Sequence, residues 1–212
     1  RVGVVLGGLV VVAGAYFWGA EGMLLGLFAG SALLTAWRLI EGLVPNWETP
    51  PRTLIRDLFS GLFTLVYVAF LASFTVLLVE AENGQWWVFA LVVIVVSVDV
   101  GAYAAGVTLG KHKMTPRISP NKTWEGFAGA AIVAMAVGTV VAIFALDQPW
   151  WVGIILGVVV LFTATGGDLT ESLIKRNLGV KDMSSWIPGH GGFLDRLDSL
   201  LPSAVGVYGV AL

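Results

Sequence analysis

Apolar runs long enough to cross a lipid bilayer recur along almost the whole chain. A transmembrane helix takes about 20 apolar residues, and charged residues make up only 12% of the sequence, against roughly 25% in soluble proteins. The sequence therefore predicts an all-α, polytopic integral membrane protein with about seven transmembrane helices. The candidate spans are Val2–Trp18, Met23–Ile40, Leu58–Val79, Trp86–Val107, Gly126–Leu146, Trp150–Gly166 and an incomplete helix from Leu200.

Seven spans place all twelve Lys and Arg residues on one side of the membrane. The opposite loops carry only acidic residues, namely Glu21, Glu80, Glu82 and Asp147. By the positive-inside rule the basic face is cytoplasmic, so we expect a multi-pass protein of the inner or plasma membrane. The chain starts at Arg1 without Met and stops within an apolar run, so we expect segments to be missing at its ends. The absence of Cys excludes a disulfide framework and thiolate chemistry.

Charge is concentrated in one segment, residues 167–198, which holds five acids, four bases and His190. Charge at this density beside a membrane-length apolar run is costly unless a charged ligand or a metal uses it. The glycines around His190 free the backbone to approach a ligand, and successive N–H groups can bind an anion. We interpret the segment as a metal-dependent site for phosphates at the membrane surface.

Four polar residues of this segment are spaced i, i+3, i+4, i+7, and share one face if the sixth span continues as a helix. Two acids repeat the i, i+3 spacing before the last span. The two helix ends could meet around a hard cation such as Mg²⁺, or the acids could simply cap a solvated helix end. The first set is Asp168, Glu171, Ser172 and Lys175, and the second is Asp195 and Asp198.

The basic residues of the segment offer charge for binding phosphates, although a purely topogenic role is open for some of them. They are Lys175, Arg176, Lys181 and Arg196. His190 is a candidate donor to a phosphate or an orienting partner of a metal ligand.

A second polar cluster, residues 117–126, lies in the other long basic loop. Its donors suit a nucleotide or phosphate and its acid suits a cation, but a capped helix start also explains a Ser or Thr followed by an acid. The cluster contains Ser119, Asn121, Lys122, Thr123 and Glu125. Asp99 lies within the fourth span, where a carboxylate is either functional or a hydrogen-bonded contact between helices.

At these residues the chain resembles the phosphatidate cytidylyltransferase family, also called CDP-diacylglycerol synthases. The signature of that family reads here as Ser172, Lys175-Arg176, Lys181-Asp182, Ser184, Pro188, His190-Gly191-Gly192 and Asp195-Arg196-Leu197-Asp198. The stretches 99–103, 119–126 and 167–171 are similar to it as well. The resemblance suggests N-terminal transmembrane helices over 1–85 and a catalytic membrane domain over 86–212.

This resemblance implies that CTP and phosphatidic acid react to CDP-diacylglycerol and pyrophosphate with Mg²⁺, and with K⁺ as a further cation, in a homodimer surrounded by membrane lipids. It implies Asp168 and Asp195 as metal ligands, and we add Glu171 and Asp99 as further candidates. The expected catalytic residues are Lys175, Arg176, Lys181, Asp182, His190, Arg196 and Asp198. The expected substrate contacts are Ser119, Asn121, Lys122, Thr123, Glu125, Ser172, Gly191 and Gly192. We expect no nucleic acid partner.

Three alternatives stay open on the sequence. A CTP-dependent transferase could act on another lipid phosphate, such as an archaeol phosphate or a polyprenol. A transporter or channel would spread charged residues along a path open to both faces, whereas here the polar groups gather on the basic side. A noncatalytic lipid-binding scaffold would bind these ligands without turnover.

Overall fold

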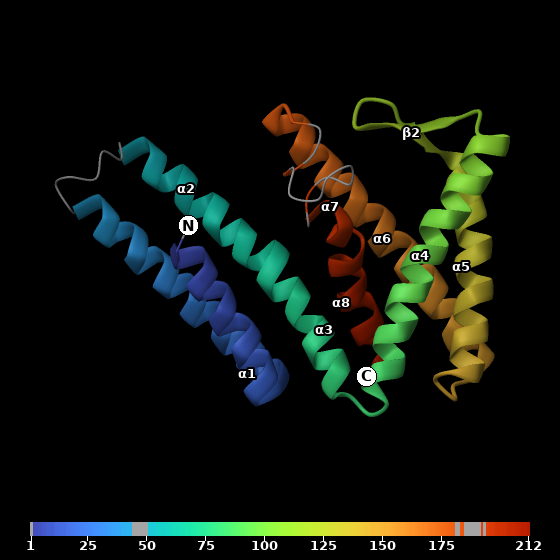
Figure 1. Ribbon diagram of the computed structural model, residues 1–212, viewed down its shortest axis with the longest axis horizontal. Coiled ribbons are helices and arrows are strands. Elements are labelled where there is room, and N and C mark those ends of the chain that lie inside the picture. The colour runs from blue at the N-terminus through green and yellow to red at the C-terminus, as the bar shows by residue number, and fades with distance from the viewer. Residues whose placement is uncertain (1, 44–50, 181–182, 185–191, 193) are drawn as a thin grey trace. The chain divides into compact units, whose positions relative to one another are not determined.

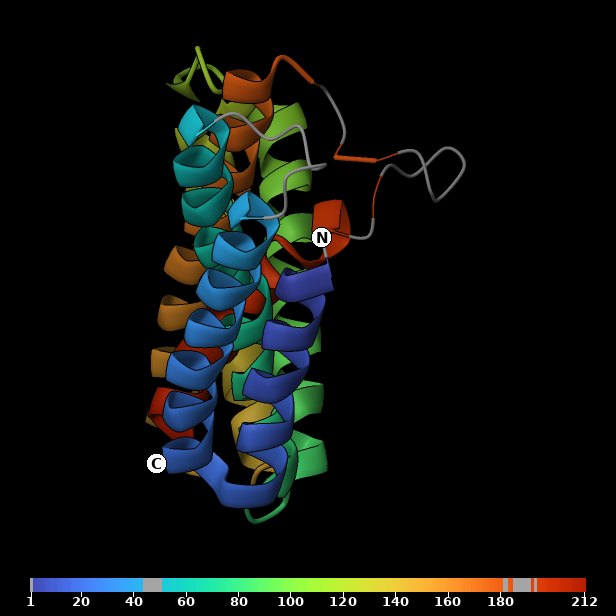
Figure 2. The same ribbon diagram turned by 90° about the vertical axis from the view of Figure 1, so that its left-hand side faces the viewer.

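The computed structural model describes residues 2–43, 51–180, 183–184, 192 and 194–212, which are almost entirely helical (Figures 1 and 2). The chain divides into two compact units, Arg1–Ala81 and Glu82–Leu212. By length and apolar composition, five of the described helices could cross a membrane. The helical content and these apolar helices confirm the prediction of an all-α membrane protein, but they do not confirm the predicted number of seven spans.

The first unit contains α1 (Val2–Leu43), α2 (Pro51–Thr64), η1 (Leu65–Phe70) and α3 (Leu71–Glu80). Helix α1 includes both of the first two predicted spans. It is interrupted at Trp18 and Gly19, where Gly19 has φ 61° and ψ −147°, a conformation that strongly favours glycine. Beyond this point the helix turns back on itself, and a Cβ on Gly30 would lie 2.7 Å from the carbonyl oxygen of Gly7. Small residues thus allow the two halves to pack closely.

The third predicted span corresponds to α2, η1 and α3, which follow one another without a break from Pro51 to Glu80. The η1 segment is a wide π-helical turn in the middle of this stretch. Such a turn is rare and changes the direction of the side chains that follow it.

The second unit contains α4 (Gly84–Leu109), β1 (Lys113–Thr115), β2 (Ser119–Thr123), α5 (Trp124–Phe144), α6 (Trp150–Leu178), α7 (Leu194–Leu197) and α8 (Leu200–Ala211). Helix α5 packs against both α4 and α6, and α8 packs against α6 and α4. Glycines permit the close approach of α4 and α5, since a Cβ on Gly101 would lie 3.0 Å from the Cα of Ala130. Thr163 of α6 donates a 3.0 Å hydrogen bond to Ser203 of α8.

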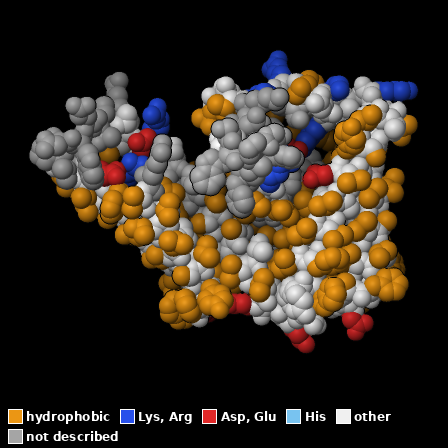
Figure 3. Space-filling model, viewed as in Figure 1, with side chains coloured by type: hydrophobic (Ala, Val, Ile, Leu, Met, Phe, Trp, Pro, Cys, Tyr) orange, Lys and Arg blue, Asp and Glu red, His pale blue; other side chains and the backbone are white. Residues whose placement is uncertain are grey.

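The surface of the helices fits a lipid environment. Large side chains such as Phe144, Ile132 and Val100 are more than half exposed, and hydrophobic side chains cover the flanks of the helices in Figure 3. In the second unit, Lys and Arg gather at the end that carries the β-strands, whereas the loops at the other end carry the acidic residues Glu82 and Asp147. This distribution of Lys and Arg agrees with the predicted pattern of basic residues on one side.

The β1–β2 hairpin departs from an all-helical chain. The strands are antiparallel, with Lys113 opposite Thr123 and Thr115 opposite Ser119. A turn joins them, closed by a 3.1 Å bond from the Ile118 N–H to the Thr115 carbonyl. Pro116 follows Thr115 at the turn position that proline favours, which is the sequence signal for this hairpin.

Candidate active site

The site is built around the end of α6. This helix continues past Gly166, the predicted end of the sixth span, to Leu178. It therefore carries the polar residues spaced i, i+3, i+4, i+7 on one face, as predicted, and Ser172 Oγ donates a 3.2 Å hydrogen bond to Asp168. Gly179 caps the C-terminal end of the helix, and Lys175 and Arg176 lie in its last turn. Cations are favourable there because the helix dipole is negative at its C-terminus.

Lys175 joins two carboxylates. Its Nζ lies 2.7 Å from Glu171 Oε2 and 3.0 Å from Asp195 Oδ1. The Glu171 side chain is 1% exposed and the Asp195 side chain 9%. Buried charges need such partners, because removing them from water is unfavourable by several kcal/mol per ion. The second carboxylate oxygen of Glu171, Oε1, is buried and receives no hydrogen bond from any described residue.

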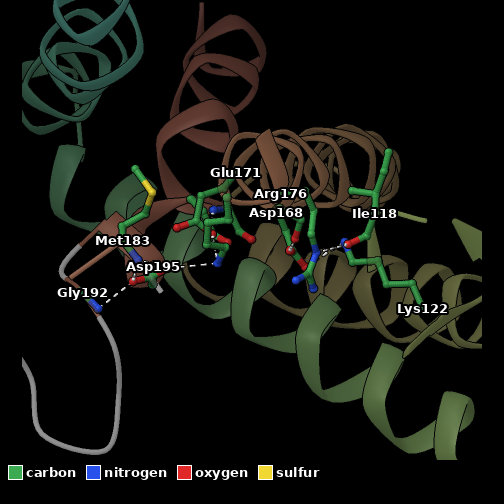
Figure 4. Close-up of polar contacts among 12 residues, drawn as sticks. Ile118, Lys122, Asp168, Glu171, Arg176, Met183, Gly192 and Asp195 are labelled. Atoms are coloured by element: carbon green, nitrogen blue, oxygen red, sulfur yellow. Dashed lines mark hydrogen bonds and ion pairs between the residues drawn. The ribbon is translucent and has the colours of Figure 1, made fainter. Parts of the chain in front are cut away.

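Asp195 also holds two backbone N–H groups, from Met183 at 3.0 Å and from Gly192 at 2.6 Å (Figure 4). Burial alone would raise the pKa of Asp195. The ion pair with Lys175 and the two N–H donors outweigh burial and hold the pKa at about 2. Asp195 is therefore a stable anion. For Asp198 the balance is reversed, because burial and then the charge of Asp168 raise its pKa.

Lys122 brings the β-hairpin to α6. Its Nζ lies 2.8 Å from Asp168 Oδ2 and 3.5 Å from the Thr165 carbonyl oxygen. Nearby, Arg176 Nε donates a 3.3 Å hydrogen bond to the Ile118 carbonyl in the turn of the hairpin. Figure 4 shows Lys122, Ile118 and Arg176 close to Asp168, with Asp195 on the other side of Glu171. Two lysines, from different parts of the chain, thus neutralise the two predicted metal ligands.

A cavity of about 300 Å³ lies between α4, β2, α5 and α6. Apolar residues such as Phe127 and Ala130 form part of its wall, and the polar part contains Asp99, Ser119, Asn121, Lys122, Thr123 and Asp168. The structure therefore brings Asp99, the second polar cluster and the end of α6 together, although they are far apart in sequence.

Two residues of the second cluster make other contacts. Thr123 caps α5, since its Oγ1 accepts a 3.1 Å hydrogen bond from the Gly126 N–H, which agrees with the capped helix start. Glu125 accepts hydrogen bonds from Lys111 and His112. Sequence reasoning did not single out His112 as a partner of the site, because the contact depends on the hairpin.

Several predicted site residues lie outside the described part of the chain: Lys181, Asp182, His190 and Gly191. Arg196 lies on α7 and is exposed, and Asp198 lies between α7 and α8. Among the described residues, no three His, Asp or Glu side chains come together as a group able to hold a metal ion. The assignment of Asp168 and Asp195 to a metal stays a prediction.

Comparison with known proteins covers nearly the whole chain. The sequence profile of the cytidylyltransferase family matches residues 2–211. A phosphatidate cytidylyltransferase of Mycobacterium bovis is 41% identical over 208 residues, which cover 96% of this chain and 68% of the relative. That of Mycobacterium tuberculosis is 41% identical over 96% of this chain and 63% of the relative. That of Brucella suis is 38% identical over 88% of this chain and 68% of the relative.

The match includes both units and every described residue of the site. The chain spans roughly two thirds of the length of these curated relatives, between 63% and 68%. The site alternates lysines with carboxylates at the end of a membrane-length helix, and the family profile matches nearly the whole chain. The chain therefore belongs to the cytidylyltransferase family.

Proposed function

We propose that this protein is a phosphatidate cytidylyltransferase, which transfers CMP from CTP to phosphatidic acid and releases pyrophosphate in phospholipid biosynthesis. The observation that carries the proposal is the alternation of cations and carboxylates around the end of α6. Lys122 faces Asp168, and Lys175 faces Asp195. Such a site can receive phosphates and a cation together, and it adjoins a cavity between membrane-length helices.

The reaction needs no covalent intermediate on the protein, because the phosphate of phosphatidic acid is itself a nucleophile. One of its oxygens attacks the α-phosphorus of CTP, a new P–O bond forms, and the bond from the α-phosphorus to the bridging oxygen breaks. Pyrophosphate leaves with that oxygen. Two anions must be brought together, so positioning and charge neutralisation dominate catalysis.

The lysines and arginines supply this neutralisation. Lys122 is assigned to CTP, together with Ser119 and Asn121, which line the same cavity. We assign Lys175 and Arg176, which lie in the last turn of α6, to phosphates that approach the site. We assign Lys181 and Arg196 to phosphate charge as well, and the turn around His190, Gly191 and Gly192 to its orientation. Asp182, Asp198 and Ser172 support these groups.

The donor set suits Mg²⁺. This ion prefers oxygen ligands and usually keeps waters while binding one or two carboxylates plus substrate phosphates, so a cluster of three protein ligands is not required. We assign it to Asp168 and Asp195, with Asp99 and Glu171 as further candidates. The buried Oε1 of Glu171, which no described residue bonds, is an available oxygen ligand. When bound, Mg²⁺ would supply a positive charge that stabilises the phosphate oxygens and the leaving pyrophosphate. K⁺ is proposed as a second cation.

We also propose that the basic loops face the cytoplasm of an inner or plasma membrane, where CTP is available. The two halves of α1 then count as separate crossings, and with α8 the chain has seven transmembrane segments. The kink at Trp18 and Gly19 supports this count. The proposed assembly is a homodimer.

The test is CTP-dependent conversion of lipid by the purified protein in detergent micelles. Phosphatidic acid should yield CDP-diacylglycerol and one pyrophosphate per product, whereas diacylglycerol, which lacks the attacking phosphate, should yield neither. EDTA should stop turnover and Mg²⁺ should restore it. Turnover of an archaeol or polyprenol phosphate in place of phosphatidic acid would reject the proposed substrate, and pyrophosphate release without lipid would reject the transfer.

A further inference from the structure

The base of the β1–β2 hairpin is tied to the start of α5 by one carboxylate. Glu125 Oε2 accepts hydrogen bonds from the backbone N–H of Lys111 at 3.1 Å and of His112 at 3.2 Å. Glu125 Oε1 lies 2.6 Å from Nδ1 of the His112 ring. A carboxylate anion only accepts hydrogen bonds, so the ring Nδ1–H is the donor.

His112 is also held from its carbonyl side. The Trp124 N–H donates a 3.0 Å hydrogen bond to the His112 carbonyl oxygen, which extends the pairing of Lys113 with Thr123 by one step. Glu125 therefore binds the backbone N–H and the ring N–H of His112, and Trp124 binds its carbonyl oxygen. A hairpin of two short strands is marginal on its own, so these bonds hold its base.

Two further contacts connect the hairpin to α6. Arg176 binds the Ile118 carbonyl near the turn, and Lys122 reaches Asp168. Lys122 lies one residue before Thr123, the residue of β2 that pairs with Lys113 at the base of the hairpin. The position from which its side chain bridges to α6 therefore depends on the base held by Glu125 and His112.

Neither Glu125 nor His112 lines the cavity, whereas Ser119, Asn121 and Lys122 do. The His112 side chain is 78% exposed. Helix capping does not account for the Glu125 contacts either, because Thr123 already occupies the N-cap of α5 and the partners of Glu125 lie before the hairpin. The contacts therefore serve the placement of the hairpin.

We propose that Glu125 and His112 form a clamp of positioning residues, which presents Lys122 to the triphosphate of CTP without touching it. This inference rests on the proposed function. It reassigns Glu125 from a direct substrate contact to a residue that acts through Lys122, and it adds His112 to the residues that determine how CTP is bound.

The clamp is tested with two pairs of variants. His112→Ala removes the ring donor, and His112→Asn keeps a side-chain N–H near the position of Nδ1. Glu125→Ala removes both acceptor oxygens, and Glu125→Gln keeps one. Lys113→Ala, an exposed neighbour on β1, is the matched control. His112 lies outside α5, so its variants test the clamp separately from the stability of that helix.

Loss of a hydrogen bond to a charged group corresponds to about a tenfold effect. We expect His112→Ala and Glu125→Ala to raise the KM for CTP about tenfold, with the KM for phosphatidic acid unchanged and kcat within about threefold of the unmodified protein. In His112→Asn and in Lys113→Ala, both KM values and kcat should stay within about threefold of those of the unmodified protein. An unchanged KM for CTP in His112→Ala, a fall in kcat alone, or equal impairment of His112→Asn would overturn the proposal.

Hydrogen exchange provides a readout that does not depend on turnover. The amides of Lys111, His112 and residues 121–123 should exchange faster in His112→Ala than in His112→Asn, in detergent and without substrates. Equal exchange rates would overturn the clamp. If the unmodified protein transferred no CMP, the proposed function would fail, and the exchange rates would still decide whether the clamp holds the hairpin.

Discussion

Lys175→Met removes the cation that joins Glu171 to Asp195, and its effect on stability can be worked out from the contacts. Met keeps most of the length of the side chain, so the packing loss is small. The carboxylate of Glu171 is 1% exposed, and Lys175 is the described residue that donates to it. Removing one partner of a buried ion pair costs about 3–5 kcal/mol.

The expected loss lies at the lower end of this range, about 3 kcal/mol. Asp195 keeps its N–H donors from Met183 and Gly192, so Glu171 carries most of the penalty. Adding Glu171→Gln removes the buried charge, and the double variant should recover at least half of the loss, since coupled residues are not additive.

The assay is equilibrium unfolding of the purified protein in mixed micelles with increasing SDS, followed by circular dichroism. Lys113→Met is the matched control, because Lys113 is exposed and such surface changes usually stay within about 0.5 kcal/mol. The reasoning is refuted if Lys175→Met is as stable as Lys113→Met, or if Glu171→Gln destabilises the Lys175→Met background further.

Three further predictions concern the substrate, the titration of the site and the packing of the helices. Lys122→Ala should raise the KM for CTP at least tenfold in a steady-state assay, and an unchanged KM would remove Lys122 from the CTP site. Because the pKa of Asp195 is held at about 2, its stabilising effect is complete above the unfolded value of about 3.9 and is lost as the pH falls toward 2. Asp195→Asn should lack this acid-dependent part of the unfolding curve, and an unchanged curve would contradict the pKa. Gly138→Val should destabilise the second unit by about 2 kcal/mol or more, because a Cβ at Gly138 would meet the backbone of Gly153. If the variant were as stable as the unmodified protein in the SDS titration, that result would contradict the packing of α5 on α6.

The helical content and much of the site follow from short-range patterns. The spacing of Asp168, Glu171, Ser172 and Lys175 predicted one helical face, and α6 confirms it. Apolar run length located the long helices because a bilayer imposes a fixed length on them. The break between the predicted spans Val2–Trp18 and Met23–Ile40 corresponds to the kink of α1 at Trp18 and Gly19. The backbone conformation of Gly19 was not predicted, because it depends on the packing of the two halves.

The contacts between distant segments were beyond sequence reasoning. Lys122 and Asp168 are 46 positions apart, and their pairing depends on a hairpin that presents Lys122 over α6. The role of Glu125 changed for the same reason. A Glu in the first turn of a helix has several possible partners, and only the placement of His112 beside it selects one.

The central claim is that the site at the end of α6 transfers CMP to a lipid phosphate. It is tested most directly by following CTP labelled at the α-phosphorus, and in parallel CTP labelled at the γ-phosphorus, in the presence of phosphatidic acid. The account predicts that the α-label enters the lipid and the γ-label appears in pyrophosphate. In Asp195→Asn, which should stay folded, neither transfer should occur. Appearance of the γ-label in the lipid, or full α-label transfer by Asp195→Asn, would contradict the account.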